Sequence, residues 1–170
     1  MLTTKAAQDA LQQEISLRRK FVSLEESVVL SLLHTQQHLD RLSETFFRGY
    51  GMTAAQFNLL MILWDHRGRP LQQTELADLL VVNRASAGEA IARARRLGWI
   101  RRSPDPKDGR AWMVSLSTKG ASALDRVKGP YYRLLAQGAK AVPKEQWQAA
   151  LGFLHSFRGF LREARKGTQP

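Results

Sequence analysis

Residues 73–116 read QTELADLLVVNRASAGEAIARARRLGWIRRSPDPKDGRAWMVSL, and this stretch decides the fold. Its apolar spacing predicts a short helix over 73–80 and a second helix over 84–97, for which Asn83 is a suitable N-cap residue. An Asp-Gly turn signal with alternating apolar residues after it predicts a β-hairpin over 99–116. Two helices joined by a tight apolar turn and followed by a hairpin are typical of a winged helix-turn-helix.

The positive charge of the chain is concentrated in the same stretch. The whole sequence has 26 Lys and Arg against 15 Asp and Glu, which gives a net charge of +11. Residues 83–110 contain eight of the basic side chains and three of the acidic ones. A basic helix followed by a basic hairpin is typical of a nucleic-acid-binding protein, although arginine-rich faces are often only solvated. The order of the elements favours DNA binding.

Length and composition indicate a globular protein of 170 residues that can bury a core without disulfides or metals. The absence of cysteine excludes disulfides, thiolate metal sites, cysteine nucleophiles and thiol-based redox switches. Residues 1–20 are polar and do not read as a signal peptide, and the apolar run at 28–33 is too short to cross a bilayer. We therefore expect a cytoplasmic protein without membrane contacts.

Long amphipathic helices are expected on both sides of the basic stretch. The first should begin well before Phe21 and continue to about Phe46, and the last should begin near Pro143. Their apolar stripes are wider than one packing partner needs, which favours a second copy of the chain as the partner. Ordinary packing within one chain is the alternative. The residues expected at such a dimer interface are Phe21, Leu24, Val28, Trp147, Leu151, Leu154, Phe157 and Leu161.

Two local signals mark the remaining helices. Thr53 and Gln56 have the spacing of a capping box, so a helix should begin there and end near Gly68. Ser117 or Thr118 can cap a later helix, in which Pro130 predicts a kink or a break.

Short motifs in a fixed order resemble the MarR family of winged-helix transcriptional regulators. They lie at 74–80, 83–86, 97–102, 105–110 and 116–120, and include the Asp-x-Arg of the wing and the Leu-Ser/Thr-x-x-Gly after it. The resemblance extends over about 53–124.

The resemblance implies a mainly α fold with a small β-hairpin wing and helices for dimerisation at both ends. The expected parts are dimerisation helices at 1–50, a winged helix-turn-helix domain at 53–120, C-terminal dimerisation helices at 121–166 and a free tail at 167–170. It also implies an obligate homodimer that reads a palindromic operator, with two recognition helices in successive major grooves and wing arginines in the flanking minor grooves.

The same resemblance implies that Asn83 and Arg84 open the recognition helix. Within it, the residues expected nearest base edges are Arg84, Ser86, Ala87 and Glu89, and Arg93 is expected nearer the backbone. Glu89 departs from the family pattern, in which a basic or neutral polar residue is common near this point. A carboxylate there repels phosphate. We interpret it as the partner of Arg93 at the favourable i, i+4 spacing, although Glu can also accept from cytosine. Gly88, in the middle of the helix, either permits a close backbone approach to DNA or has no role.

In the wing, one glycine separates Asp108 from Arg110 at the hairpin tip. We expect the carboxylate to hold the guanidinium extended, toward a narrow minor groove. Arg101, Arg102 and Lys107 are expected to contact phosphates.

Many members of the family bind small aromatic or anionic effectors. The residues expected to line an effector pocket here are His34, His38, Arg41, Tyr50, Phe57 and Trp64. His34 and His38 have the spacing to share a metal ion, but no third ligand is apparent in the sequence, so solvated or core-edge histidines are the preferred interpretation and no metal site is predicted.

The residues together with the resemblance thus predict a homodimeric, DNA-binding repressor without a cofactor. Release by a small aromatic or anionic effector is what the resemblance implies. The chain is not expected to be an enzyme, because it lacks a phosphate-binding glycine loop, nucleophile motifs and clustered carboxylates. A sequence-tolerant architectural DNA-binding protein and a ligand-independent regulator are the alternatives. Docking on anionic lipid is disfavoured, because no basic amphipathic helix exposes bulky apolar residues.

Overall fold

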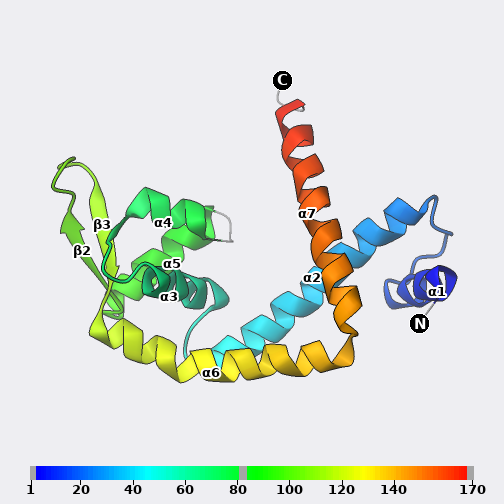
Figure 1. The fold of residues 1–170 in the computed structure, drawn as a ribbon, viewed down its shortest axis with the longest axis horizontal. Coiled ribbons are helices and arrows are strands. Elements are labelled where there is room, and N and C mark those ends of the chain that lie inside the picture. The colour runs from blue at the N-terminus through cyan, green and yellow to red at the C-terminus, as the bar shows by residue number, and fades with distance from the viewer. Residues whose placement is uncertain (1–2, 81–83, 168–170) are drawn as a thin grey trace. The chain divides into compact units, whose positions relative to one another are not determined.

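The structure is a computed structural model that describes residues 3–80 and 84–167. The chain divides into two compact units, Met1–Leu124 and Asp125–Pro170, and each is described by itself. Asn83 lies outside the described residues, as does the side chain of Arg84. Figure 1 labels the elements along the chain.

The first unit opens with the helices α1 (Thr4–Glu14), α2 (Leu24–Arg48) and α3 (Ala54–Asp65). The expectation of one long helix that begins well before Phe21 is wrong. α1 ends at Glu14, Ser16 has a φ of 53°, and the Ser23 hydroxyl accepts from the Glu26 backbone N–H to begin α2. Apolar residues continue at helical spacing across this break, so the spacing does not reveal it. The Ser23 cap is the local signal that marks the start of α2.

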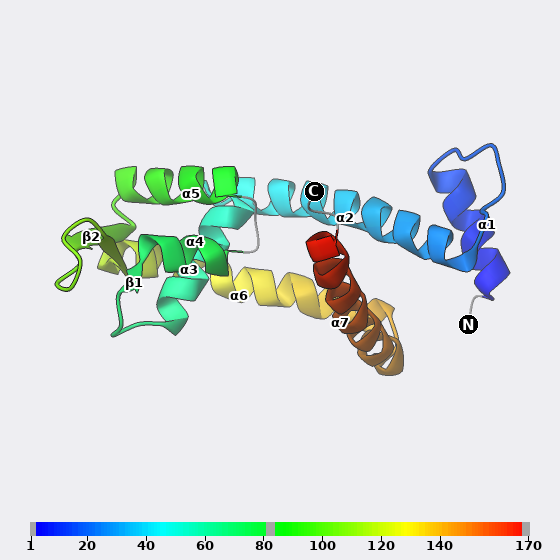
Figure 2. The same ribbon diagram turned by 90° about the horizontal axis from the view of Figure 1, so that it is seen from above.

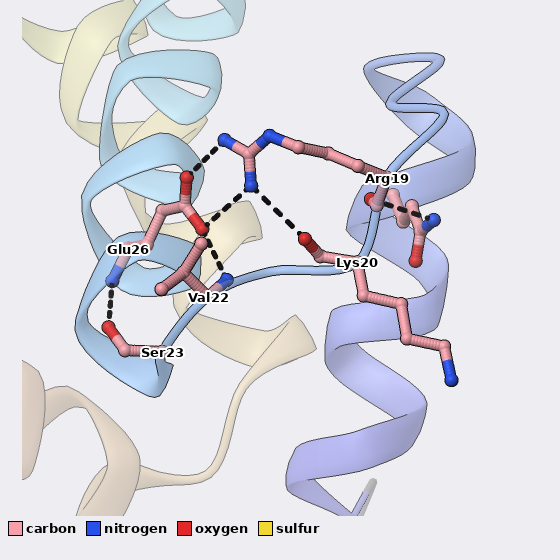
Figure 3. A network of polar contacts seen from close by, with 6 residues as sticks. Arg19, Lys20, Val22, Ser23 and Glu26 are labelled. Carbon is pink, nitrogen blue, oxygen red and sulfur yellow. Dashed lines mark hydrogen bonds and ion pairs between the residues drawn. The ribbon is translucent and has the colours of Figure 1, made fainter.

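A polar network holds the connection between α1 and α2. The Arg19 guanidinium donates to both carboxylate oxygens of Glu26, one of them at 3.1 Å, and the Val22 backbone N–H donates to Glu26 Oε2 at 2.6 Å (Figure 3). The hydrogen bond from Arg19 and then that from Val22 lower the pKa of Glu26 from 4.5 to about 2. In α1, the Gln8 amide donates to Ser27 Oγ at 3.1 Å.

The predicted winged helix-turn-helix is present in the first unit. It consists of β1 (Leu71–Gln72), α4 (Gln73–Leu79), α5 (Arg84–Arg96), β2 (Ile100–Pro104) and β3 (Trp112–Leu116). The strands form an antiparallel sheet in the order β1-β3-β2, in which Leu71 pairs with Val114 and Arg102 pairs with Val114 from the other side. β1 was not predicted, because two residues are too few to show an alternating pattern.

The core of the first unit lies between this sheet and the helices α3, α4 and α5, which Figures 1 and 2 show gathered beside it. Its most buried large side chains are Leu59, Leu60, Leu71, Leu76, Val114 and Leu124. The capping box that begins α3 is complete: Thr53 Oγ1 accepts from the Gln56 N–H at 3.2 Å, and Gln56 Oε1 accepts from the Thr53 N–H at 2.9 Å. The start of α3 is therefore fixed as predicted.

α6 (Thr118–Ala141) begins in the first unit and ends in the second, where α7 (Lys144–Gly167) follows it. Pro130 lies inside α6 without interrupting it, so the chain is not broken at this position. α7 begins where Pro143 predicted and has no buried residue. Among the described helices, none combines the length and the apolar character that crossing a membrane requires.

Candidate nucleic-acid interface

The helix α5 has one buried face and one basic exposed face. Ala87, Ala90, Ile91 and Ala94 are at most 5% exposed and pack into the core at the spacing of a helix face. The exposed residues of the other face are Ala85, Gly88, Glu89, Ala92, Arg93, Arg95 and Arg96. Small buried side chains let α5 sit close to the core, while its long cationic side chains reach solvent.

The structure corrects one residue expected near base edges and one expected ion pair. Ala87 is 0% exposed, so its methyl group belongs to the core and cannot contact a base. Glu89 and Arg93 both line a small cavity with Ser86 and Gln56, of about 220 Å³. Among the ion pairs of the described residues, however, none joins Glu89 to Arg93. The glutamate therefore does not neutralise Arg93 in this structure.

At Gly88, a Cβ atom would meet nothing within 4 Å. The isolated chain therefore has room for a larger residue at this position. Only a close approach of bound DNA would give glycine a steric advantage here.

The wing, residues 100–116, carries the second set of cations. Arg101 is exposed on β2, and Lys107 and Arg110 are exposed at the tip. Arg102 is half-buried, and its guanidinium lies 4.2 Å from the centre of the Trp112 ring. Pairing of Pro104 with Trp112 places Arg102 diagonally across from the indole. This cation–π contact, which the sequence analysis missed, holds the guanidinium against the sheet.

The hairpin tip is organised by Asp105, which is only 8% exposed and was absent from the predicted site. Its carboxylate accepts from the Lys107 N–H at 2.8 Å and from the Gln72 amide of β1 at 2.7 Å. These hydrogen bonds, that from Lys107 first, hold the pKa of Asp105 below its usual range. An aspartate that bonds the N–H two residues on is a known turn-forming pattern, and the Asp-Pro-Lys run was the available signal.

Asp108 acts differently from the prediction. Its Oδ1 accepts from the Arg110 backbone N–H at 2.9 Å, and the ion pairs of the described residues do not include one with the Arg110 guanidinium. The carboxylate therefore shapes the turn, since the nearer donor is the backbone two residues on. The Arg110 side chain is left exposed at the tip.

The base of the wing is joined to the first turn of α6. Ser117 Oγ donates to the Gly98 carbonyl at 2.6 Å and accepts from the Gly120 N–H at 2.9 Å, while the Ser117 N–H donates to the Trp99 carbonyl at 3.0 Å. A Cβ on Gly120 would lie 2.1 Å from the Trp99 oxygen. The Leu-Ser-x-x-Gly run thus fixes the strands of the wing to a helix.

The six residues predicted to line an effector pocket do not all come together in the chain. His34 and His38 lie side by side on α2, whereas Tyr50 and Phe57 belong to an aromatic cluster with Phe46 and Phe47, in which Phe57 is a core residue. The Arg67 guanidinium lies 4.2 Å from the centre of the Trp64 ring. His34 and Tyr50 lie 16 positions apart on or just beyond α2, which corresponds to about 24 Å of helix. A different cavity, of about 450 Å³, is lined by Arg48 at the end of α2, by Thr53 and Ala54 at the start of α3, and by Arg93 of α5.

The predicted dimer residues are mostly accessible. Leu24 of α2 and Trp147, Leu151 and Leu161 of α7 are exposed, whereas Val28, Leu154 and Phe157 are half-buried. Phe21 is half-buried but lies in the connection before α2 rather than on a helix.

Comparison with known proteins identifies a family model and relatives that are similar to this chain. Residues 50–111 match the sequence model of the MarR family. The chain is 29% identical to the HTH-type transcriptional repressor YetL of Bacillus subtilis over an alignment of 97 residues. This alignment covers 57% of this chain and 58% of YetL. Across the curated relatives, the chain spans 58% to 65% of their length. These relatives carry the names of regulators or resistance proteins and not of enzymes, in agreement with the prediction.

Two solved structures with bound DNA are also similar. Sco3205 of Streptomyces coelicolor, a MarR family transcriptional regulator solved in complex with DNA, shares 28% identity. It aligns with a TM-score of 0.69 over 88% of this chain and 95% of its own. A mutant MarR of Escherichia coli complexed with operator DNA shares 27% identity and has a TM-score of 0.62. The latter alignment covers 74% of this chain and 89% of that protein.

Proposed function

Because this chain belongs to the MarR family of winged helix-turn-helix transcriptional regulators, we propose that it is a repressor that binds double-stranded DNA as a homodimer. Two neighbouring features carry the proposal. The exposed face of α5 carries Arg93, Arg95 and Arg96, and the wing beside it is held in place by hydrogen bonds of Asp105 and Ser117. α5 enters the major groove, where Arg93, Arg95 and Arg96 meet the backbone. Arg110 enters the flanking minor groove.

The proposed operator is palindromic, because a two-fold dimer presents two copies of α5 to two equivalent half-sites. The helices of 1–50 and 121–166 supply the dimer contacts in this proposal. They leave large apolar side chains exposed in the single chain, among them Leu33, Leu39, Leu151 and Phe160. A partner surface of the same chemistry covers them in a dimer.

A competition gel shift tests this function against that of an architectural DNA-binding protein. A labelled palindromic fragment from the promoter region of the protein's own gene is competed with unlabelled copies of itself and with random DNA. We expect the specific competitor to be at least a thousandfold more effective, which is the lower end of the range for sequence-specific regulators. Near-equal competition would overturn sequence-specific repression in favour of architectural binding.

We further propose that a small aromatic anion releases the repressor by binding the 450 Å³ cavity that joins α2 and α3 to Arg93. Two arginines, Arg48 and Arg93, line this cavity together with Asp40 and Glu44. Arg48 pairs with Glu44, so Arg93, which belongs to the DNA-reading helix, is the cation assigned to the anion. A thermal-shift screen with phenolic carboxylates should show stabilisation of the wild type, with less in Arg93→Ala. No stabilisation across a broad set would instead favour a ligand-independent regulator.

A further inference from the structure

Two histidines on α2 form a close pair. His34 and His38 are one helical turn apart, and their Nε2 atoms are separated by 3.2 Å. The rings meet edge to face at an interplanar angle of 89°, with centroids 4.6 Å apart. In this arrangement, one neutral ring donates its N–H and the other accepts it. Each ring therefore turns its Nε2 atom toward that of the other.

A carboxylate from another helix lies beside the pair. Glu14 is the last residue of α1, and its Oε2 is 3.6 Å from His34 Nε2. The Arg19–Glu26 network in the following connection keeps the end of α1 close to α2 (Figure 3). Because Glu14 precedes His34 by 20 positions and comes from a separate helix, sequence spacing alone did not associate it with the histidines.

We propose that His34 and His38 bind one divalent transition-metal ion such as Zn²⁺ through their Nε2 atoms, beside the negative charge of Glu14. Zn²⁺ binds imidazole nitrogen at about 2.0–2.1 Å, and tetrahedral angles then place two such nitrogens about 3.3–3.4 Å apart. The observed separation of 3.2 Å is close to this value, so the two side chains need little movement to take up the ion.

The site uses two protein ligands and water. Within the described parts of the chain, no three histidine, aspartate or glutamate side chains are grouped around one ion position. Glu14 is accordingly placed as a neighbouring charge that favours the cation, not as a preassembled third ligand. Imidazole ligands suit Zn²⁺, Ni²⁺ and Cu²⁺ better than Mg²⁺ or Ca²⁺, which prefer oxygen. The site lies on α1 and α2 and does not depend on the proposed DNA binding.

The test is calorimetric titration of the metal-free full-length chain with ZnSO₄, without DNA. We expect one Zn²⁺ per chain, at least tenfold weaker binding in His34→Ala and in His38→Ala, and wild-type binding in His155→Ala. His155 is an exposed histidine of α7 and serves as the matched control. Circular dichroism verifies that each variant is folded, since alanine is compatible with α2.

Two further measurements separate this site from adventitious binding. Zn²⁺ should raise the Tm of the wild type and of His155→Ala but not that of His34→Ala or His38→Ala. Glu14→Gln should retain binding at a severalfold weaker Kd, with less dependence on ionic strength. Wild-type titration curves in both α2 variants would overturn the site, and an unchanged Kd in Glu14→Gln would overturn the role of the carboxylate.

Discussion

At the scale of single residues, Gly120 shows how one missing side chain holds the wing in place. The first turn of α6 lies so close to Trp99, which directly precedes β2, that a Cβ on Gly120 would be 2.1 Å from the Trp99 carbonyl oxygen and 2.9 Å from Leu116 Cδ1. Glycine is needed here for space and not for backbone conformation, because its φ is not in the left-handed region. The close approach allows the Ser117 hydroxyl to bridge α6 and the Gly98 carbonyl.

We predict that Gly120→Ala lowers the free energy of unfolding by about 2–3 kcal/mol, because the clash involves backbone that cannot move away. In an open helix position, the same change would stabilise the protein by up to about 1 kcal/mol. Gly88→Ala on α5 is the matched control, since a Cβ there meets nothing within 4 Å. Urea unfolding of both variants measures the difference. Equal stabilities for the two would contradict the packing of α6 against Trp99.

Asp105 gives a second prediction at this scale. In Asp105→Asn, one carboxylate oxygen is replaced by an amide donor, so either the Lys107 N–H or the Gln72 amide loses its acceptor. The loss of a hydrogen bond to a charged group should destabilise the folded wing. Hydrogen exchange of the Lys107 amide should become faster, and DNA affinity should fall.

The control for Asp105 is Asp108→Asn, because that carboxylate is exposed and accepts its hydrogen bond from the Arg110 backbone N–H at the tip of the wing. Its effect on exchange of the Lys107 amide should be smaller. If the two variants behave alike, Asp105 has no special part in holding the tip.

The sequence predicted the exposed cations of α5 and the wing more reliably than it predicted their partners. Arg93, Lys107 and Arg110 are exposed as expected, since charged side chains seldom enter a core. Ala87 was misplaced because alanine is compatible with either face, and only its registry with Ile91 and Ala94 decides the matter. The Glu89–Arg93 and Asp108–Arg110 pairs were not found, because spacing makes a pair possible while rotamers and nearer backbone donors determine whether it forms.

At the scale of elements, the wing should contribute to DNA binding through its exposed tip. We predict that Arg110→Ala weakens operator binding severely and lowers the slope of log affinity against log salt by about one unit for each wing that contacts DNA. Fluorescence anisotropy at several salt concentrations measures both quantities. Lys5→Ala removes the same charge from the exposed face of α1 and should change neither much. An unchanged affinity and slope in Arg110→Ala would reject the wing as a DNA contact.

The connection between α1 and α2 should respond to acid. Because folding lowers the pKa of Glu26 from 4.5 to about 2, the ionised carboxylate stabilises the connection above pH 4.5. That contribution is lost as the pH falls from about 4.5 to about 2. We predict that the protection factor of the Val22 amide, its intrinsic exchange rate at each pH divided by its observed rate, decreases across this interval, because this N–H donates to Glu26.

In Glu26→Gln, the protection factor of the Val22 amide should be low at every pH, whereas Glu44→Gln, which alters a separate pair on α2, should behave as the wild type. A Glu26 titration midpoint near 4.5, followed by NMR, would show that the Arg19 and Val22 contacts do not form in solution.

Elements with a strong local signal were predicted well, and elements defined by tertiary pairing were not. The capping box of α3 and the hairpin have signals within a few residues of one another, and both are present. β1 exists only because Leu71 meets Val114, more than 40 positions later in the chain. The break after Glu14 was missed because apolar residues continue at helical spacing on both sides, and spacing does not reveal a cap.

At the scale of the whole molecule, the two units differ in how completely they bury their apolar side chains. The first unit has a core between its sheet and helices, whereas α7 of the second has no buried residue. Phe153, Phe157 and Phe160 stack on one another along α7, yet Phe160 remains 63% exposed. Contiguous exposed apolar surface of this kind is typical of an interface. The wide apolar stripe of α7, which the sequence also shows, is therefore not explained by packing within the second unit.

We predict that Leu151→Glu converts a dimer into a monomer. Leu151 is 67% exposed in the single chain, so a charge costs little there, but it would be buried without a partner in a dimer interface. Sedimentation equilibrium should give about twice 19.2 kDa for the wild type and about 19.2 kDa for the variant. Gly152→Glu adds the same charge about 100° around α7 from Leu151 and about 80° from Phe160, given about 100° per residue. A Cβ at this position meets nothing within 4 Å, so this variant should remain dimeric. If the wild type is itself a monomer at micromolar concentration, the proposed two-fold reading of a palindromic operator is wrong.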